Sequence, residues 1–172
     1  MMGAGKSTVG PALARRLGVP FVDLDAEIER ASGRGIPEIF EAQGEEAFRA
    51  LEAEALERVA GSERVVALGG GALTQYGVSE RVAAAGTVVY LRAAPQTLLE
   101  RIGDPAGRPL LAGLGPREIL ERLSALLTER EPAYARAAIS VDTDRSSVGE
   151  VVEQIVVRLG IATCGARQGN AE

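Results

Sequence analysis

Apolar positions along the chain follow two different spacings. Where they recur every three or four residues, as at Val9, Leu13 and Leu17, they line one face of a helix. Short continuous apolar runs, as at residues 87–91, indicate buried strands instead. These spacings predict helices over residues 6–17, 26–31, 36–42, 45–60, 78–85, 95–102, 116–131 and 148–159, and strands over residues 21–24, 65–68, 87–91 and 138–141.

The alternation of strands with helices predicts an α/β fold. Short apolar strands joined by helices favour right-handed crossovers and a parallel sheet with helices on both faces. Because no linker or repeat interrupts the pattern, we expect a single domain over residues 1–160 and a loose polar tail over 161–172. Residues 103–115, GDPAGRPLLAGLG, carry little helix or strand pattern, and a loop of this length in a compact domain predicts a mobile lid.

Composition narrows the classes of function. The chain of 172 residues is 46% hydrophobic with a net charge of −5, which gives no electrostatic support for a nucleic-acid or anionic-membrane partner. No apolar run is long enough to span a bilayer, and no secretory signal is visible. One cysteine, Cys164, fits a reducing cytoplasm. The absence of histidine leaves a hard, oxygen-bound ion such as Mg²⁺ as the expected metal.

The segment Gly3–Thr8, GAGKST, predicts a phosphate-binding loop. Its glycines let backbone N–H groups surround phosphate oxygens, Lys6 can reach the transferred phosphate, and Ser7 can place a hydroxyl on Mg²⁺. Lys6 is also the only lysine among 19 cationic residues. The full pattern, G-x-x-x-x-G-K-[ST], has its first glycine and its strand before Met1, so we expect the natural start to lie upstream. Without that strand, both neighbouring strand edges would be exposed.

Two carboxylates follow the strand at 21–24. Parallel sheets bind their ligands at the carboxyl ends of strands, so Asp23 is a candidate for holding Mg²⁺ and Asp25 for accepting a proton from a substrate hydroxyl. The alternative is that Asp25 only caps the next helix.

Arg49 and Glu52 lie three residues apart on one predicted helix, so Glu52 can orient the guanidinium toward a substrate carboxylate. The alternative is an ordinary surface ion pair. The triple glycine at 69–71 ends a strand and suggests close approach of another group to the main chain, although a tight turn would explain it too.

Two further arginines are candidates. Arg108, within the expected lid, can close over phosphates, unless it is simply a solvated loop residue. Arg130, near the end of the helix at 116–131, can meet a substrate anion or only favour the negative end of that helix.

Taken in order, the segments MGAGKST, D-L-D, F-R-x-x-E, the triple glycine, R-P-L-L and R-x-P-x-Y resemble those of the shikimate kinase family over about residues 1–159. The resemblance implies a P-loop kinase of three layers with a five-stranded parallel sheet, whose first strand is missing here. It also implies Mg²⁺-dependent transfer of the γ-phosphoryl of ATP to the 3-hydroxyl of shikimate, on the route to chorismate and the aromatic amino acids.

The resemblance also implies roles for individual residues. The catalytic residues would be Lys6, Asp25 and Arg108, and the metal would be held by Ser7 and Asp23. ATP would be bound by Gly3, Ala4, Gly5, Lys6, Ser7, Thr8, Arg101, Arg108 and Arg145, the last being one place earlier than the family's usual arginine. Shikimate would be bound by Asp25, Arg49, Gly70 and Arg130, with Phe40 and Phe48 as pocket walls or core residues.

Two rival functions remain open on the sequence. Another small-molecule P-loop kinase, such as a gluconate kinase, shares the phosphate loop and lid but does not account for Arg49, Gly70 and Arg130 together. The second rival is a regulatory nucleotide-binding protein without transfer activity, although intact Lys6 and Asp25 argue against it. We expect a monomer whose partners are ATP and shikimate.

Overall fold

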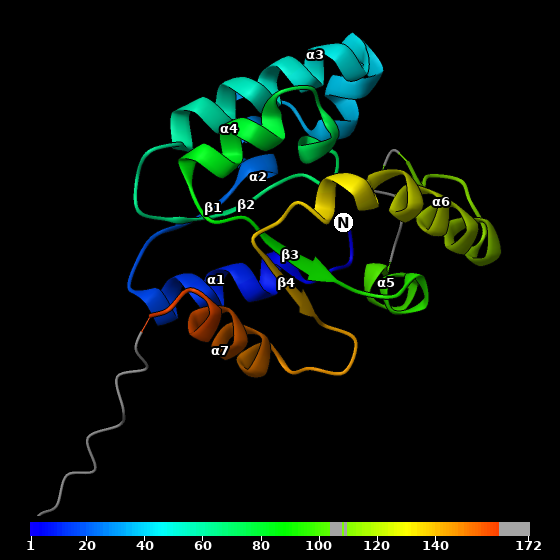
Figure 1. Cartoon of the computed structure of the whole chain (residues 1–172). Helices are drawn as coiled ribbons and strands as arrows, with labels where there is room; N and C mark the ends of the chain where they lie inside the picture. The colour runs from blue at the N-terminus through cyan, green and yellow to red at the C-terminus, as the bar shows by residue number, and fades with distance from the viewer. Residues whose placement is uncertain (104–107, 109, 162–172) are drawn as a thin grey trace, which may run out of the picture.

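The computed structural model describes residues 1–103, 108 and 110–161 of the chain. Residues 104–107 and 109 of the lid expected at 103–115 lie outside the described residues. So does the expected tail from residue 162 onward, with Cys164. Helices and strands follow one another from end to end of the described chain (Figure 1). In order they are α1 Lys6–Leu17, β1 Phe21–Asp23, α2 Leu24–Ser32, α3 Ile36–Val59, β2 Val65–Ala67, the 3₁₀ turn η1 Ala72–Thr74, α4 Val78–Ala85, β3 Val89–Arg92, α5 Pro95–Ile102, α6 Pro116–Tyr134, β4 Ile139–Asp142 and α7 Val148–Arg158.

The strands form two parallel pairs. Phe21 of β1 lies opposite Val65 of β2, and Val89 of β3 lies opposite Ile139 of β4. No hydrogen-bonded pairing joins the two pairs within the described residues, so the parallel sheet is present as two half-sheets with unpaired inner edges. This agrees with the expectation that both neighbouring strand edges are exposed when the first strand of the sheet is missing. A cavity of about 450 Å³ lies between the inner edges of β2 and β3.

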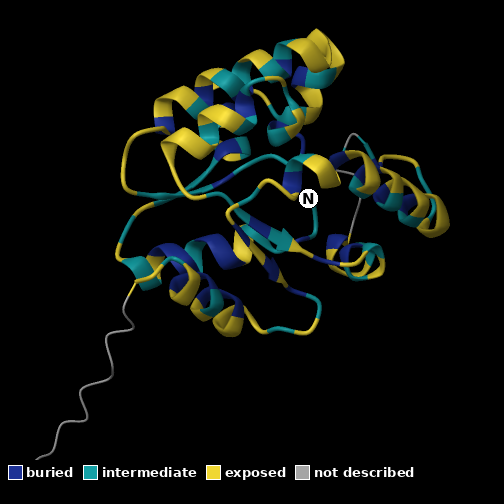
Figure 2. Ribbon diagram, in the orientation of Figure 1, coloured by how far each residue is buried: buried dark blue, intermediate teal, exposed yellow. Residues whose placement is uncertain are grey.

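Helices lie on both sides of the half-sheets, as predicted. In Figure 1, α1 and α7 lie below the strands, α2, α3 and α4 lie above β1 and β2, and α5 with α6 lies beside the end of β3. Figure 2 shows that the buried residues lie mainly on the helix faces turned toward the strands. Among the described helices, none combines the length and apolar character that crossing a membrane requires.

The core is divided into three apolar clusters, one for each group of helices. Leu98 and Leu123 are fully buried between α5 and α6. Val141 of β4 packs with α1 and α7, and Leu24 packs with α2 and α3. Leu111, inside the expected lid, is fully buried in the α5–α6 cluster, so this part of the lid is anchored to the core.

Most element bounds agree with the prediction, and the differences have local causes. The helices predicted at 36–42 and 45–60 run on as α3, but Gly44 between them has φ 80° and ψ 177°, so the axis breaks there as expected. Leu24 begins α2 because the Asp23 side chain accepts a hydrogen bond from the Asp25 N–H and caps the helix. The helix predicted to end at 131 continues to Tyr134, with Pro132 inside its last turn.

Candidate active site

The glycine loop places the start of α1 at the centre of the molecule. Gly3 and Gly5 have φ of 73° and 92°, a left-handed conformation that side chains disfavour. A Cβ on Gly3 would also lie 2.9 Å from the Leu98 carbonyl oxygen. Gly5 is the last residue before α1, and the Thr8 N–H of the first turn donates to its carbonyl oxygen at 3.0 Å. The N-terminal end of the helix, where Ser7 is exposed, carries the positive potential that suits an anion.

Lys6 lies among both acidic and basic residues. Its Nζ donates a hydrogen bond to the Met1 carbonyl oxygen at 2.9 Å. Burial lowers the pKa of the Lys6 ammonium, and the nearby carboxylates of Asp25 and Asp23 partly oppose that shift. The Arg108 guanidinium acts on Lys6 in the lowering direction. The charges of Asp25, Asp23 and Arg108 therefore all act on the Lys6 ammonium.

The two carboxylates at the end of β1 have separate surroundings. Asp23 caps α2, so the alternative reading of Asp25 as the cap is wrong. The Asp25 Oδ1 is buried without a hydrogen-bond partner. Burial raises the pKa of Asp25 to about 6, and repulsion from Asp23 and Glu52 adds to the shift. Asp25 is thus a carboxylate whose free oxygen is available to a hydroxyl donor.

Gly69, the first residue of the triple glycine, lies against two carboxylates. A Cβ there would be 2.5 Å from the Glu52 Oε1 and 3.1 Å from the Asp25 Oδ1. Those two oxygens are both buried without a hydrogen-bond partner. The absence of a side chain at Gly69 therefore lets α3 and the start of α2 meet at this strand end.

Gly70 and Gly71 lie against the two candidate anion-binding arginines. A Cβ on Gly70 would be 3.2 Å from the Arg130 Nη1, and one on Gly71 would be 2.6 Å from the Arg49 Nη2. Neither glycine has a positive φ. The close approach that the sequence suggested is therefore the reason for these glycines, and a tight turn with positive φ is not. It brings Arg49 and Arg130, 81 positions apart by their numbers, onto one short stretch of backbone.

The predicted Arg49–Glu52 pair is present and belongs to a larger network. The Arg49 guanidinium donates to Glu52 and to Glu45, each at 2.8 Å, and its Cζ lies 5.2 Å from the centre of the Phe48 ring. Glu52 is only 2% exposed and also accepts a hydrogen bond from the Gln75 Nε2 at 2.5 Å. Gln75 was missed by the sequence analysis, because nothing in the pattern connects it to a residue 23 positions away.

Arg130 is a buried cation. It is 6% exposed, and its Nε has no hydrogen-bond partner. Since α6 continues one more turn, Arg130 does not lie at the helix end, which disfavours the alternative of a simple helix-end charge. Tyr134, the tyrosine of R-x-P-x-Y to which the sequence assigned no role, donates from its Oη to the Gly70 carbonyl oxygen at 2.5 Å and packs its ring 4.8 Å from that of Tyr90. It fixes the glycine segment to α6.

Phe40 and Phe48 pack together, with ring centres 4.8 Å apart. Phe48 is buried in the cluster of α2 and α3, which supports the core alternative for that residue.

Arg101 at the end of α5 and Arg145 after β4 lie near each other, and Arg108 belongs to the expected lid. Arg101 donates to the Thr143 Oγ1 at 2.9 Å and to the Thr143 carbonyl oxygen at 2.5 Å. Arg145 lies two residues beyond Thr143 and is exposed. The Arg108 carbonyl oxygen accepts the N–H of Leu111 at 2.9 Å, which ties Arg108 to the anchored part of the lid. The structure thus brings Arg101 and the Arg145 loop together.

The donor set fits a metal shared with a ligand. Among the described residues, no group of three or more acidic, cysteine or histidine side chains could enclose an ion. Ser7 and Asp23 offer a hydroxyl and a carboxylate oxygen, both hard donors. Mg²⁺ is commonly held by one or two protein oxygens together with phosphates and water, so this sparse set suits Mg²⁺ bound with a nucleotide.

A glycine loop leading into α1, beside parallel strands that end in carboxylates, defines a P-loop α/β phosphotransferase. Sequence comparison identifies a particular family within this class. The sequence profile of the family described as "Shikimate kinase" matches residues 2–160. The chain belongs to the shikimate kinase family.

Individual relatives agree with this assignment. A shikimate kinase of Chlorobium luteolum is 44% identical over 163 residues, covering 91% of this chain and 81% of that protein. One of Thermus thermophilus is 46% identical over 160 residues, covering 92% and 85%.

Solved structures agree as well. The shikimate kinase from Acinetobacter baumannii in complex with shikimate superposes with a TM-score of 0.83 at 38% identity, over 92% of this chain and 89% of that one. The enzyme from Bacteroides thetaiotaomicron gives a TM-score of 0.86 at 36% identity, over 92% and 94%.

Proposed function

We propose that this protein transfers the γ-phosphoryl of ATP to the 3-hydroxyl of shikimate, giving shikimate 3-phosphate and ADP. Membership of the family and the shikimate-bound relative support the substrate. One observation of this chain carries the proposal: Arg49 and Arg130 converge on the glycine segment next to Asp25. Two guanidinium groups suit the carboxylate of a small acid, and a carboxylate nearby suits its hydroxyls.

On the nucleotide side, the backbone of Gly3–Thr8 would hold the phosphates with the Lys6 ammonium. Arg108 would add positive charge over the same phosphates, and Arg101 and Arg145 would flank the adenine. Ser7 and Asp23 would hold Mg²⁺, which when bound supplies neutralisation of phosphate charge. Catalysis of this kind depends mainly on positioning and on stabilising charge.

On the acceptor side, Arg49 and Arg130 would bind the shikimate carboxylate, assisted by the Gly70 main chain. Asp25 would accept a hydrogen bond from the attacking hydroxyl and take its proton as the new P–O bond forms. A carboxylate with a pKa near 6 is a stronger base than an ordinary aspartate and is still ionised at neutral pH. The network of Glu45, Glu52 and Gln75 would hold Arg49 in place.

We further propose that residues 1–160 act as one domain and that the protein works as a monomer in the cytoplasm. Its partners would be ATP and shikimate, with no nucleic acid and no membrane. The net charge of −5 disfavours a nucleic-acid or anionic-membrane partner, and the single cysteine fits a reducing cytoplasm.

The test is ADP release from Mg²⁺-ATP with and without shikimate, with gluconate as a competing acceptor. We expect release that depends on shikimate and is about 10²–10³-fold lower in Lys6→Met, because the charge on the transferred phosphate loses a partner. Arg117→Met, at a side chain 92% exposed, is the control and should keep full activity. Release that is unchanged by shikimate, or faster with gluconate, would contradict the proposed acceptor.

A further inference from the structure

Two side chains of α6 converge on one glycine. Arg130 and Tyr134 are four positions apart, so they lie one turn apart on the same face of the helix. The Tyr134 Oη donates to the Gly70 carbonyl oxygen at 2.5 Å, and the Arg130 Nη1 lies 3.2 Å from the place that a Cβ on Gly70 would take. The main chain of Gly70 is therefore held between a hydroxyl and a guanidinium of the same helix.

The three carbonyl oxygens of the triple glycine are held in different ways. Those of Gly69 and Gly71 each accept an N–H of the neighbouring turn η1 at 3.2 Å, so local structure fixes them. The Gly70 carbonyl oxygen accepts instead from Tyr134, 64 positions away in sequence. Since a glycine has no Cβ to restrict its backbone angles, this distant hydroxyl is what orients the middle peptide group.

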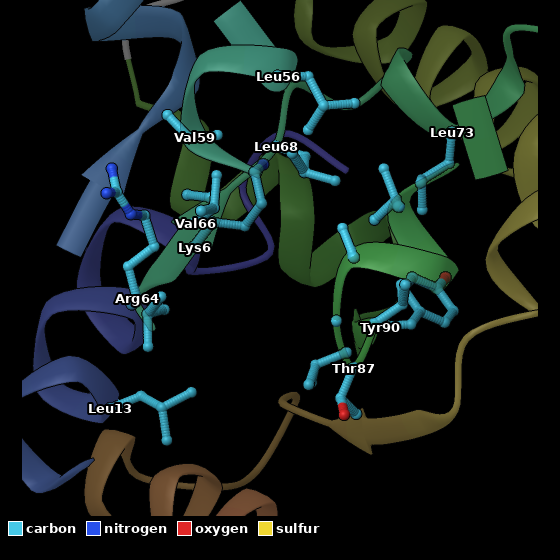
Figure 3. A pocket seen from close by; sticks show the side chains of 18 of the residues that line it. Lys6, Leu13, Leu56, Val59, Arg64, Val66, Leu68, Leu73, Thr87 and Tyr90 are labelled. Atoms are coloured by element: carbon cyan, nitrogen blue, oxygen red, sulfur yellow. The ribbon is translucent and has the colours of Figure 1, made fainter. Parts of the chain in front are cut away.

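The Tyr134 ring is held by apolar contacts that do not need its hydroxyl. It is buried in the cluster of α5 and α6, and its centre lies 4.8 Å from that of the Tyr90 ring. Figure 3 shows Tyr90 on β3, beside the cavity between β2 and β3. Phenylalanine at position 134 would therefore keep this packing and lose one hydroxyl, so the role of the hydroxyl can be tested apart from that of the ring.

The Tyr134 hydroxyl also lies within the field of the Arg130 charge. Burial raises the pKa of the Tyr134 phenol, and the Arg130 guanidinium opposes that shift. The Met1 Sδ, a weak acceptor, is farther from the Tyr134 Oη at 4.0 Å. A guanidinium carries five N–H donors and no acceptor, so a carbonyl oxygen left unpaired beside it becomes its partner. Without the hydroxyl, the Gly70 carbonyl oxygen would take donors of Arg130 that an anion needs.

We propose that Tyr134 is a positioning residue of the acceptor site, whose hydroxyl holds the Gly70 carbonyl oxygen and so keeps the Arg130 guanidinium available to the carboxylate of the acceptor. Tyr134 acts through Arg130 and Gly70 and not by contact with the substrate. The inference rests on the proposed function, in which Arg130 binds that carboxylate. A tyrosine with a merely structural role would affect stability without a selective effect on one substrate.

The first test is the steady-state kinetics of Tyr134→Phe, with ADP release measured while each substrate is varied in turn. We expect the KM for shikimate to rise about tenfold, because a guanidinium bonded to the Gly70 carbonyl oxygen binds the carboxylate less well. The KM for ATP and kcat should change by less than about twofold, since the nucleotide side is untouched. The melting temperature without ligands shows that the variant is folded.

Two matched variants remove other hydroxyls from the same surroundings. Thr74→Val loses the bond of 2.8 Å from the Thr74 Oγ1 to the Gly71 carbonyl oxygen, which the Thr74 N–H still holds. Tyr90→Phe loses the contact of 3.4 Å between the Tyr90 Oη and the Glu131 Oε2. Both variants should keep the KM of the parent for shikimate, because neither hydroxyl holds the Gly70 carbonyl oxygen.

A double-mutant cycle tests whether Tyr134 acts through Arg130. Isothermal titration calorimetry gives the Kd for shikimate in the parent, in Tyr134→Phe, in Arg130→Met and in the double variant. We expect Tyr134→Phe to weaken binding in the parent and to have no further effect in Arg130→Met, because the guanidinium that the hydroxyl protects is then absent. Effects that multiply independently would mean that Tyr134 acts elsewhere and would overturn the inference.

The outcomes separate this inference from the function on which it rests. A parent protein whose ADP release ignores shikimate would overturn the proposed function, and the inference with it. A parent that uses shikimate, beside a Tyr134→Phe variant with the same KM for shikimate or with equal losses for shikimate and ATP, would overturn the inference alone.

Discussion

Gly71 and Gly86 show how differently two glycines can act in one chain. A Cβ on Gly71 would lie 2.6 Å from the Arg49 Nη2, whereas one on Gly86 would meet nothing within 4 Å. Neither position has a positive φ in the left-handed region, so backbone strain does not distinguish them. What distinguishes them is the guanidinium that lies on the backbone at Gly71.

Gly71→Ala should therefore displace the Arg49 guanidinium. We expect the KM for shikimate to rise about tenfold, since small displacements of a positioning group are costly, with the KM for ATP unchanged. Gly86→Ala is the control and should alter neither. Steady-state kinetics with each substrate varied in turn makes the measurement, and an equal loss for both substrates would mean that the whole fold has shifted.

Asp25 should make stability depend on pH. Its pKa in the folded protein is raised to about 6 from an ordinary value of 3.8, so the folded state holds the proton more tightly than the unfolded chain does. The free energy of unfolding should fall as pH rises from about 4 through about 6. Asp25→Asn removes the buried charge that lowers stability at neutral pH. At pH 7.5 its free energy of unfolding should exceed that of the parent by on the order of 1–2 kcal/mol, after allowance for partial solvent exposure.

Urea unfolding at pH 4.5 and pH 7.5 measures the difference. Asp142→Asn is a control in which the change in stability should have the opposite sign, because the N–H of Asp144 holds the pKa of Asp142 below its usual range. That variant should lose stability at neutral pH. A parent protein and Asp25→Asn variant with parallel pH profiles would refute the assignment of a raised pKa to Asp25.

At the scale of elements, α1 packs directly on β1. A Cβ on Gly10 of α1 would lie 2.3 Å from a ring carbon of Phe21, so the helix can approach the strand only because this position lacks a side chain. Helix propensity alone would favour alanine at Gly10. Packing between elements therefore overrides the preference of the isolated helix.

Gly10→Ala should destabilise the protein by about 1–3 kcal/mol, because overpacking exceeds the gain in propensity. Gly149→Ala, in α7, meets nothing within 4 Å and should stabilise by up to about 1 kcal/mol. Thermal unfolding of the two variants beside the parent compares them. A stabilised Gly10→Ala would show that the Phe21 ring can move away without cost.

The elements also show where prediction from sequence succeeds. The helices predicted at 6–17, 78–85 and 95–102 have the bounds of α1, α4 and α5, because glycine or proline marks an end of each. The strand predicted at 87–91 is shifted to Val89–Arg92, since its apolar pattern does not specify which residues pair with β4. Strand bounds depend on the partner strand, which lies 50 positions away in sequence.

At the scale of the whole molecule, the anion pocket joins parts that are far apart in sequence. Arg49 comes from α3, Arg130 from α6 and the glycines from the segment after β2. A ligand that bridges them stabilises the folded state by linkage, since the unfolded chain does not assemble the pocket.

Saturating shikimate should therefore raise the melting temperature, and at 100 times Kd the gain is about 2.7 kcal/mol. Arg49→Ala should abolish the rise, whereas Arg58→Ala, near the end of the same helix and 47% exposed, should keep it. Differential scanning fluorimetry with shikimate alone is sufficient. A full rise in Arg49→Ala would mean that this arginine does not bind the ligand.

The sequence by itself determined the order of elements, the phosphate loop and the identity of most candidate residues, because periodicity and short motifs are local. It also predicted the Arg49–Glu52 pair, which lies within one turn of a helix. Only the structure decided that Gln75 bonds to Glu52, that Tyr134 bonds to the Gly70 main chain, and that Asp23 and not Asp25 caps α2. The Gln75 and Tyr134 hydrogen bonds depend on packing between segments distant in sequence, about which local patterns carry no information. The choice of cap is local, but either aspartate suits a cap, so only the geometry distinguishes them.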